Sequence, residues 1–247
     1  MANRSDVLAK INEWLAPENF QDYAPNGLQV EGSESVGVIV SGVTASQALI
    51  DEAVKQNADM ILVHHGYFWK GEGQTIRGMK KNRIKQLLDN DINLVAYHLP
   101  LDDHPEYGNN RQLADILGIQ NPRPMGGLVW QGELPEPMSS EKFGLHLARA
   151  LHRQPLHVGN GPEMIKTVAW CTGAAQGFIN AALDAGVDAY ISGEISEPTT
   201  HTARECGIHY YAAGHHATER YGVQALGEAL AREFGVMHQF IDCDNPV

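Results

Sequence analysis

The sequence contains little cysteine and no long apolar run. Its three cysteines, Cys171, Cys206 and Cys243, are widely spaced and form no Cys-x-x-Cys pair, which argues against a disulfide framework or a zinc ribbon. We expect them to be reduced core residues. No apolar stretch approaches the roughly 18 residues of a membrane span. The amino-terminal stretch MANRSDVLAKINEWL is amphipathic and lacks the apolar centre of a signal peptide, which predicts a cytoplasmic protein.

Basic residues are also scarce. The chain has 18 Lys and Arg against 30 Asp and Glu, a formal net charge of −12, and this charge repels a phosphate backbone at long range. The balance disfavours a dedicated nucleic-acid binder without excluding one. The stretch RGMKKNRIK departs from it and is interpreted either as a solvated helix face or as a phosphate-facing patch. Its basic residues are Arg77, Lys80, Lys81, Arg83 and Lys85.

Several widespread catalytic motifs are missing. The chain has no phosphate loop ending in Gly-Lys-Ser/Thr, no Gly-x-Gly-x-x-Gly opening a helix and no Gly-x-Ser-x-Gly elbow. These absences argue against a P-loop nucleotidase, a dinucleotide-binding enzyme of the usual kind and a serine hydrolase.

Short apolar runs alternate with helical patterns along the chain, which predicts an α/β protein. We expect helices at 6–15, 46–56, 79–90 and 111–117, with strands at 36–43, 60–63 and 93–97. The string NPRPMGG, residues 121–127, is rich in turn residues and is expected to lead out of a first lobe. The expected division is a first α/β lobe at 1–125 and a second at 126–247, whose final helix and strand are free to pack back on the first lobe.

The second half repeats the first at a shift of 129 residues. VTASQALIDEAVKQNADMILVHHG then lies on TGAAQGFINAALDAGVDAYISGEI, with five identities. The identical pairs are Ala45/Ala174, Gln47/Gln176, Ile50/Ile179, Ala53/Ala182 and Asp59/Asp188. The sequence therefore predicts two similar lobes from an internal duplication, with sheets flanked by helices. Ligands of open α/β sheets gather at the carboxyl ends of strands, so we expect a cleft where the strand ends of both lobes converge.

A second match joins INLVAYHLPLD to IHYYAAGHHATE, two short apolar strands that each end near a histidine. In both copies a carboxylate follows four residues later, as His98 with Asp102 and His215 with Glu219. On a helix this spacing puts both side chains on one face about 6 Å apart, where imidazole and carboxylate can chelate zinc, manganese, iron or nickel better than calcium. The alternative is a histidine at a helix start with a solvent-facing glutamate.

His64 and His65 close an apolar strand in VHHGYFWKG. They are interpreted either as metal ligands or as a strand cap that hydrogen-bonds to loop carbonyls. With His98, Asp102, His215 and Glu219 they would suffice for two metal ions about 3.5 to 4 Å apart. Asp103 and the other histidines are expected to be structural or exposed: His104, His146, His152, His157, His201, His209, His216 and His238.

The three aromatic residues after the histidine pair, Tyr67, Phe68 and Trp69, also have two interpretations. Core packing is the commoner fate of such residues. Beside a metal cleft they could instead stack on a planar ring of a ligand.

Taken together, DYAPNGLQVEG, GVTAS, VHHGYFWKG, HLPLD with GNN after it, and GHHATER resemble the GTP cyclohydrolase 1 type 2 homologues, also called NIF-three-like dinuclear metal proteins. The similarity runs from about Asp22 to the carboxyl terminus. It implies a two-lobed α/β fold, two divalent metal ions in a cleft between the lobes, and a ring-shaped homohexamer. It implies a metal-binding set of His64, His65, Asp102, His215 and Glu219, with His98 beside the metals. The domain that longer relatives insert between the halves is absent.

The expected function is a dinuclear metal-dependent hydrolase in which a metal-activated water attacks a small molecule or nucleotide, with His98 or Glu194 moving the proton. For GTP the attacked atom would be C8 of the imidazole ring. The alternative function is a non-enzymatic, metal-binding hexameric scaffold or a stress-response protein related to DNA damage.

Overall fold

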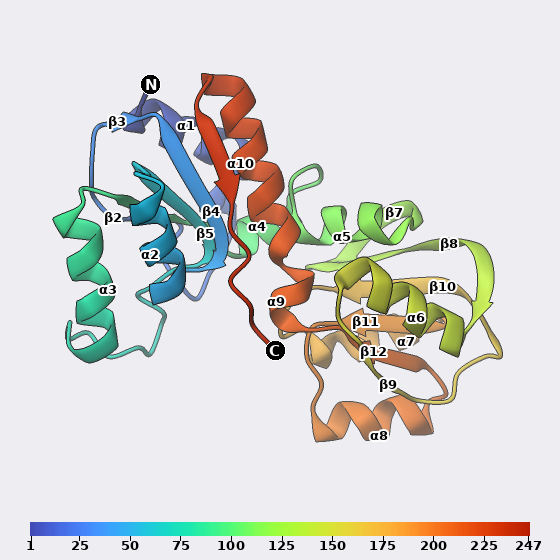
Figure 1. The fold of residues 1–247 in the computed structure, drawn as a ribbon. Helices are drawn as coiled ribbons and strands as arrows, with labels where there is room; N and C mark the ends of the chain where they lie inside the picture. Colours follow the sequence, from blue (N-terminus) through green and yellow to red (C-terminus); the bar gives the residue numbers. More distant parts are fainter. The chain divides into compact units, whose positions relative to one another are not determined.

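The computed structural model describes residues 1–247, which divide into two compact units. The first unit comprises Met1–Tyr107 and Gly222–Asp244, and the second comprises Gly108–Tyr221 and Asn245–Val247 (Figure 1). The chain therefore leaves the first unit, builds most of the second, and returns before its last three residues rejoin the second. None of its helices is both long and apolar enough to cross a membrane.

The first unit is built on a five-stranded sheet in the order β13-β4-β5-β6-β2, parallel except for β2 at one edge. Its strands are β2 (Gly27–Val30), β4 (Val38–Thr44), β5 (Met60–His65), β6 (Asn93–Ala96) and β13 (Met237–Phe240). A separate two-stranded sheet pairs β1 (Ala2–Asn3) with β3 (Ser35–Val36). The central strand β5 is buried on both faces, as its apolar run predicts.

Helices cover both faces of this sheet (Figure 1). They are α1 (Arg4–Leu15), α2 (Gln47–Lys55), α3 (Gly78–Asp89) and α10 (Arg220–Phe234), with a short α4 (Leu99–Asp103) and a 3-10 turn, η1 (Pro17–Asn19). Ile61 and Val63 pack in one core with α2 and α3, whereas Met60 and Leu62 pack in another with α1 and α10. The alternation of strand side chains thus assigns each pair of helices to its own face.

The second unit contains a six-stranded sheet in the order β7-β8-β10-β11-β12-β9. Its strands are β7 (Gln120–Gly126), β8 (Val129–Ser139), β9 (Leu156–Val158), β10 (Met164–Cys171), β11 (Ala189–Ser192) and β12 (His209–Ala212). The central three, β10, β11 and β12, are parallel. The flanking helices and turns are α5 (Asn109–Leu117), α6 (Ser140–Leu151), η2 (Gln176–Phe178), α7 (Ile179–Asp184), α8 (Glu197–Glu205) and α9 (His215–Thr218).

The repeat in the sequence corresponds to a repeated framework. Asp59, just before β5, accepts hydrogen bonds at Oδ2 from the backbone N–H groups of Gly37 and Val38, at 2.8 and 2.9 Å. Asp188, just before β11, accepts at Oδ2 from Lys166 and Thr167 N–H groups, at 2.9 and 2.8 Å. The identical aspartates therefore tie corresponding parallel strands together.

Two features differ from the sequence-based expectations. NPRPMGG is not a linker but most of β7, which pairs antiparallel with β8; its prolines fit because β7 is an edge strand. The boundary between the units falls after Tyr107 instead of after residue 125. The reason is that α5 buries Leu113 and Leu117 in a core of the second unit.

The cysteine expectation is corrected at one position. All three cysteines are free thiols and Cys171 is buried, but Cys206 is exposed and Cys243 is half-buried. Cys206 is the C-cap of α8, where the chain turns through solvent into the next strand.

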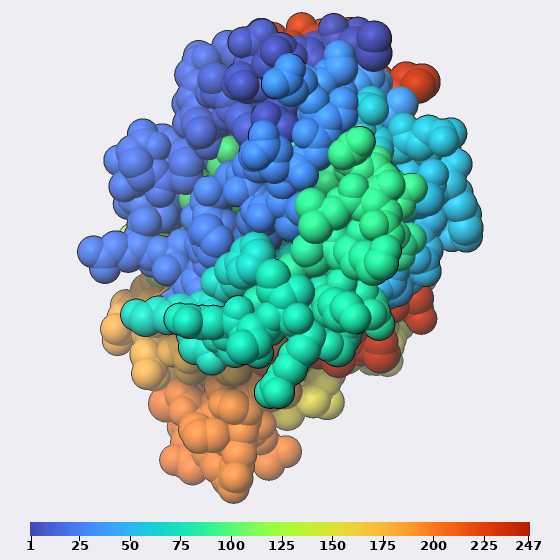
Figure 2. Space-filling view, turned by 90° about the vertical axis from the view of Figure 1, so that its left-hand side faces the viewer, coloured from blue at the N-terminus to red at the C-terminus, as the bar shows by residue number.

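The basic stretch at 77–85 forms a surface helix. Figure 2 shows the teal segment before α3 and the green helix itself on the outside of the first unit. Lys80 Nζ lies 3.2 Å from Glu72 Oε2 and 4.5 Å from the ring of Phe68, and Lys85 pairs with Asp89. These contacts fit the solvated helix face.

Candidate functional site

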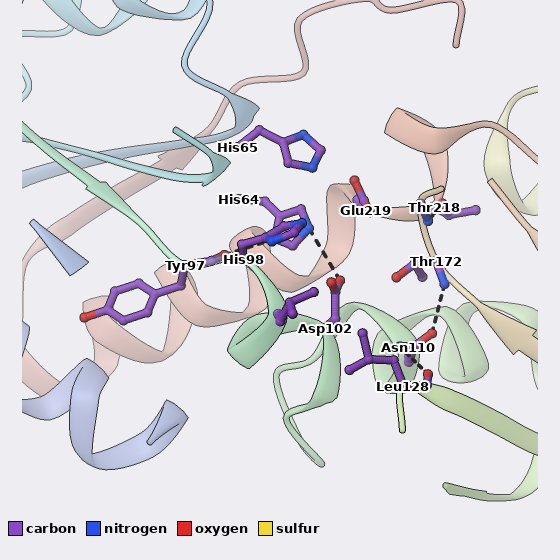
Figure 3. A network of polar contacts seen from close by, with 12 residues as sticks. His64, His65, Tyr97, His98, Asp102, Asn110, Leu128, Thr172, Thr218 and Glu219 are labelled. Atoms are coloured by element: carbon purple, nitrogen blue, oxygen red, sulfur yellow. Dashed lines mark hydrogen bonds and ion pairs between the residues drawn. The ribbon is translucent and has the colours of Figure 1, made fainter. Parts of the chain in front are cut away.

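In the first unit, ligand-type side chains gather at the carboxyl ends of neighbouring parallel strands. His64 and His65 end β5, and His98 follows β6; one ring nitrogen from each lies within 4.8 Å of the others. Adjacent residues in a regular strand point to opposite faces, yet the rings of His64 and His65 are 4.6 Å apart. Figure 3 shows the three rings side by side. The backbone therefore turns at the end of the strand, and the rings of His64 and His65 both lie next to His98.

Hydrogen bonds fix how these rings face. His64 Nδ1 lies 3.0 Å from the carbonyl oxygen of Tyr97, which can only accept, so Nδ1 carries the proton and the lone pair of the neutral ring is on Nε2. His65 Nδ1 contacts the hydroxyl of Thr44 at 3.3 Å. This use of Nδ1 for a protein oxygen is typical of histidines that present Nε2 to a metal.

Asp102 joins this group from α4. One helical turn after the N-cap residue His98, its Oδ1 lies 3.4 Å from His64 Nε2, and the aspartate is buried (Figure 3). A lone pair and a carboxylate oxygen repel each other unless a proton or a metal cation lies between them. The pair has the donor chemistry of a site for a divalent ion with nitrogen and oxygen ligands.

His98 is held from behind by Asp22. Its Nδ1 donates to Asp22 Oδ1 at 2.6 Å, while Asp22 Oδ2 accepts from the N–H of Leu99 at 2.9 Å. Burial raises the pKa of Asp22, but hydrogen bonds from His98 and Asn26 outweigh it and lower that pKa to about 2. The aspartate therefore stays charged and keeps the proton of neutral His98 on Nδ1, with the lone pair on Nε2.

The second unit carries its own group at the equivalent strand ends. His215 begins α9 after β12, and its Nε2 lies 3.1 Å from Glu219 Oε2. Glu194, after β11, accepts from His215 Nδ1 at 2.7 Å. Burial lowers the pKa of His215, but Glu219 and Glu194 outweigh it and raise the pKa to about 9. Without a metal, a proton thus occupies the position between imidazole and carboxylate.

A glycine makes room for Glu219. A Cβ on Gly173 would lie 2.1 Å from Glu219 Oε1, and φ at this residue is +68°. The N–H of Gly173 donates to the hydroxyl of Thr218 at 3.1 Å. Figure 3 shows Asn110 beside this loop, accepting from the N–H of Thr172 at 3.1 Å. The loop after β10 is therefore built so that the carboxylate can pass against its backbone.

The three aromatic residues after His65 have different environments. Tyr67 is buried and donates to the Ala45 carbonyl at 2.8 Å, as a core residue does, whereas Phe68 is exposed. The ring of Trp69 lies 4.9 Å from His98 and 5.9 Å from His65, edge-on or tilted. Of these three aromatic residues, Trp69 is thus the one that lies next to the histidines of the first unit.

Asp22, Asn26 and Gln29 support the histidine group, although no pattern in the sequence pointed to them individually. Asn26 donates to Asp22 Oδ2 at 2.9 Å and accepts from the N–H of His98 at 2.8 Å. Gln29 Oε1 accepts from the N–H of Tyr67 at 2.7 Å. All three residues lie in DYAPNGLQVEG. The family resemblance, which includes this motif together with VHHG and HLPLD, was the feature of the sequence that could have indicated them.

Several of the remaining histidines make structural contacts. His146 lies 2.9 Å from the Leu117 carbonyl, His238 lies 2.8 Å from Ser41, and His157 and His209 contact each other at 3.0 Å. Their expected structural role fits these contacts.

Comparison with known proteins places the chain in a family. The sequence profile of Duf34/NIF3 (NGG1p interacting factor 3) matches residues 2–246. The chain belongs to the Duf34/NIF3 family. Its relatives in this family include the GTP cyclohydrolase 1 type 2 homolog of Pseudomonas aeruginosa, 56% identical over 250 residues and 98% of each chain. The homolog from Escherichia coli K12 is 57% identical over 237 residues and 96% of each chain.

Solved structures agree. The protein ybgI, described as of unknown function, is 54% identical with a TM-score of 0.97, and TTHA1606 from Thermus thermophilus is 32% identical with a TM-score of 0.93. Both comparisons cover 100% of each chain. The resemblance expected from the five motifs and the two-lobed α/β fold of the Duf34/NIF3 family are confirmed.

Proposed function

We propose that this protein is a metal-dependent hydrolase in which both groups of ligands act together on two divalent metal ions. The metal ligands would be His64, His65, Asp102, His215 and Glu219. One observation carries the proposal: in each unit a histidine with Nδ1 hydrogen-bonded to a protein oxygen directs Nε2 at a buried carboxylate, at 3.4 Å in one unit and 3.1 Å in the other. A cation satisfies both partners of each such pair.

The donor set fits zinc, manganese, iron or nickel, because imidazole and carboxylate ligands suit all four. When bound, a pair of such ions supplies Lewis acidity and lowers the pKa of coordinated water towards neutrality. The convergence of the two groups in one cleft, the ring-shaped homohexamer and the cytoplasmic location remain predictions from the sequence.

The chain's own residues supply the proton transfer. His98 is held by Asp22 with its lone pair on Nε2, so Nε2 is the atom that accepts a proton from the attacking water and later returns it to the leaving group. Glu194 accepts a hydrogen bond from His215 Nδ1 and so orients that imidazole. Its other expected role, moving the proton in place of His98, remains a prediction from the sequence. Trp69, at the edge of His98, offers a surface for a planar ring.

The name of the relatives, GTP cyclohydrolase 1 type 2 homolog, makes GTP the first substrate to test. We expect metal-dependent opening of the guanine imidazole ring, detected by NMR as loss of the C8 proton signal of GTP. A His215→Ala, Glu219→Ala double variant should be inactive, and His201→Ala, an exposed histidine on α8, should retain full activity.

Turnover that persists in the double variant would contradict the proposal. Metal binding without turnover of GTP or of a nucleotide library would favour the non-enzymatic metal-binding scaffold instead.

A further inference from the structure

A cavity of about 360 Å³ opens in the second unit, where β11 and β12 end. This volume lies in the range of small-molecule pockets, about 300 to 1,000 Å³. Its lining includes Arg153, Leu156, Glu194, Ile195, Ala212 and Val247. The carboxyl ends of parallel strands are where α/β sheets bind ligands, and all of these residues belong to the second unit.

Arg153 brings a positive charge to this cavity. A Cβ on Gly214 would lie 2.5 Å from Arg153 Nε, so the absence of a side chain at Gly214, where φ is +102°, lets the arginine pack against the backbone. This backbone leads directly into His215. Close packing against Gly214 therefore restricts the position of the Arg153 side chain.

The guanidinium lacks an anionic partner. Arg153 donates from Nη1 to the neutral carbonyl of Pro246, and no salt bridge joins it to a carboxylate. Its Nε is buried against Gly214, so the donors that a ligand in the cavity can reach are those of the Nη atoms. The Nη donors of arginine form a planar fork that matches the two oxygens of a phosphate or carboxylate. The unused hydrogen-bonding capacity of Arg153 thus fits an anion.

The other walls restrict what such an anion carries. Leu156 and Ile195 are apolar and suit a short carbon skeleton, while Glu194 can accept a hydrogen bond from a hydroxyl or an ammonium group. Glu194 also accepts a hydrogen bond from His215 Nδ1, so a ligand that contacts Glu194 is separated from that imidazole only by the Glu194 carboxylate.

We propose that this cavity binds small molecules that combine a phosphate or carboxylate with a hydrogen-bond donor, and that Arg153 recognises the anionic group. The inference stands on residues of the second unit alone and needs no metal ion.

The test uses the full chain, freed of metal with EDTA so that the probe cannot coordinate an ion. Calorimetric titration with glycerol 3-phosphate and with glycerate, which share a carbon skeleton, distinguishes a phosphate from a carboxylate site; glycerol is the neutral probe. We expect saturable binding of at least one anion and none of glycerol. Arg153→Gln should weaken binding roughly 10-fold or more, because charge-assisted hydrogen bonds are lost. Arg149→Gln, an exposed arginine on α6, should not change it.

Leu156→Trp keeps the arginine and fills the cavity, so it should also weaken binding, and circular dichroism checks that each variant is folded. No saturable binding by the folded wild-type chain, or equal binding by folded Arg153→Gln, would overturn the proposal. Metal content measured before EDTA treatment reports separately on the proposed hydrolase site, so failure of one idea leaves the other readable.

Discussion

Replacing Glu194 with glutamine tests the proposal that Glu194 helps His215 to bind a metal ion. The carboxylate has two effects on the imidazole. It orients the ring through a 2.7 Å hydrogen bond to Nδ1, and removal of such an outer partner typically costs about 10- to 100-fold in metal affinity. With Glu219 it also outweighs the effect of burial and raises the pKa of His215 to about 9, so a proton competes with the metal.

The two effects have different pH dependence. The raised pKa means that His215 is protonated below about pH 9. At pH 7 a metal ion must therefore displace a proton, which lowers the apparent metal affinity about 100-fold. Glu194→Gln lowers that pKa and so relieves part of the competition at pH 7 but none above pH 9. We therefore expect the variant to bind about 10- to 100-fold more weakly at pH 9.5 and the gap to narrow at pH 7.

Chelator-competition titrations with zinc at both pH values measure this gap. Glu197→Gln, an exposed glutamate in the first turn of α8, is the matched control and should behave as wild type. A gap that is constant with pH, or that widens towards pH 7, would refute the reasoning.

Two further predictions concern backbone geometry and strand ties. Gly173→Ala should abolish metal retention, because its Cβ would collide with the Glu219 carboxylate. The control Gly186→Ala has the same φ of +68° but nothing within 4 Å of its Cβ, so it should cost only backbone strain. The metal content of the two purified variants checks this prediction, and equal metal retention would contradict it. Asp59→Ala and Asp188→Ala each leave strand N–H groups without an acceptor and should lower the free energy of unfolding by about 1–3 kcal/mol. Chemical denaturation measures both, and a change in one variant alone would contradict their equivalence.

Local pattern predicted much of the fold. The run Met60–Val63 is apolar because β5 is covered on both faces, and the helical periodicity around Ile50 predicted α2 almost to the residue. The unit boundary could not be obtained in this way, because the sheet on which α5 packs is decided by contacts distant in sequence. Prolines in β7 are likewise compatible with a linker until its edge position is known.

The sequence predicted those residues of the candidate site that lie together within one short motif. The four-residue spacing from His98 to Asp102 and from His215 to Glu219 identified pairs that share a helical turn. Asp22 was missed because its contact with His98 spans 76 residues. No periodicity signals a contact of that separation.

The central claim is that the ligand residues of both units hold metal together, and metal content per chain tests it most directly. Plasma mass spectrometry on protein purified without an affinity tag, with His65→Ala from the first unit and Glu219→Ala from the second, separates the contributions. The account predicts about two transition-metal ions per wild-type chain and loss of metal in both variants. Content near zero that added metal does not restore, or content unchanged by either substitution, would contradict it.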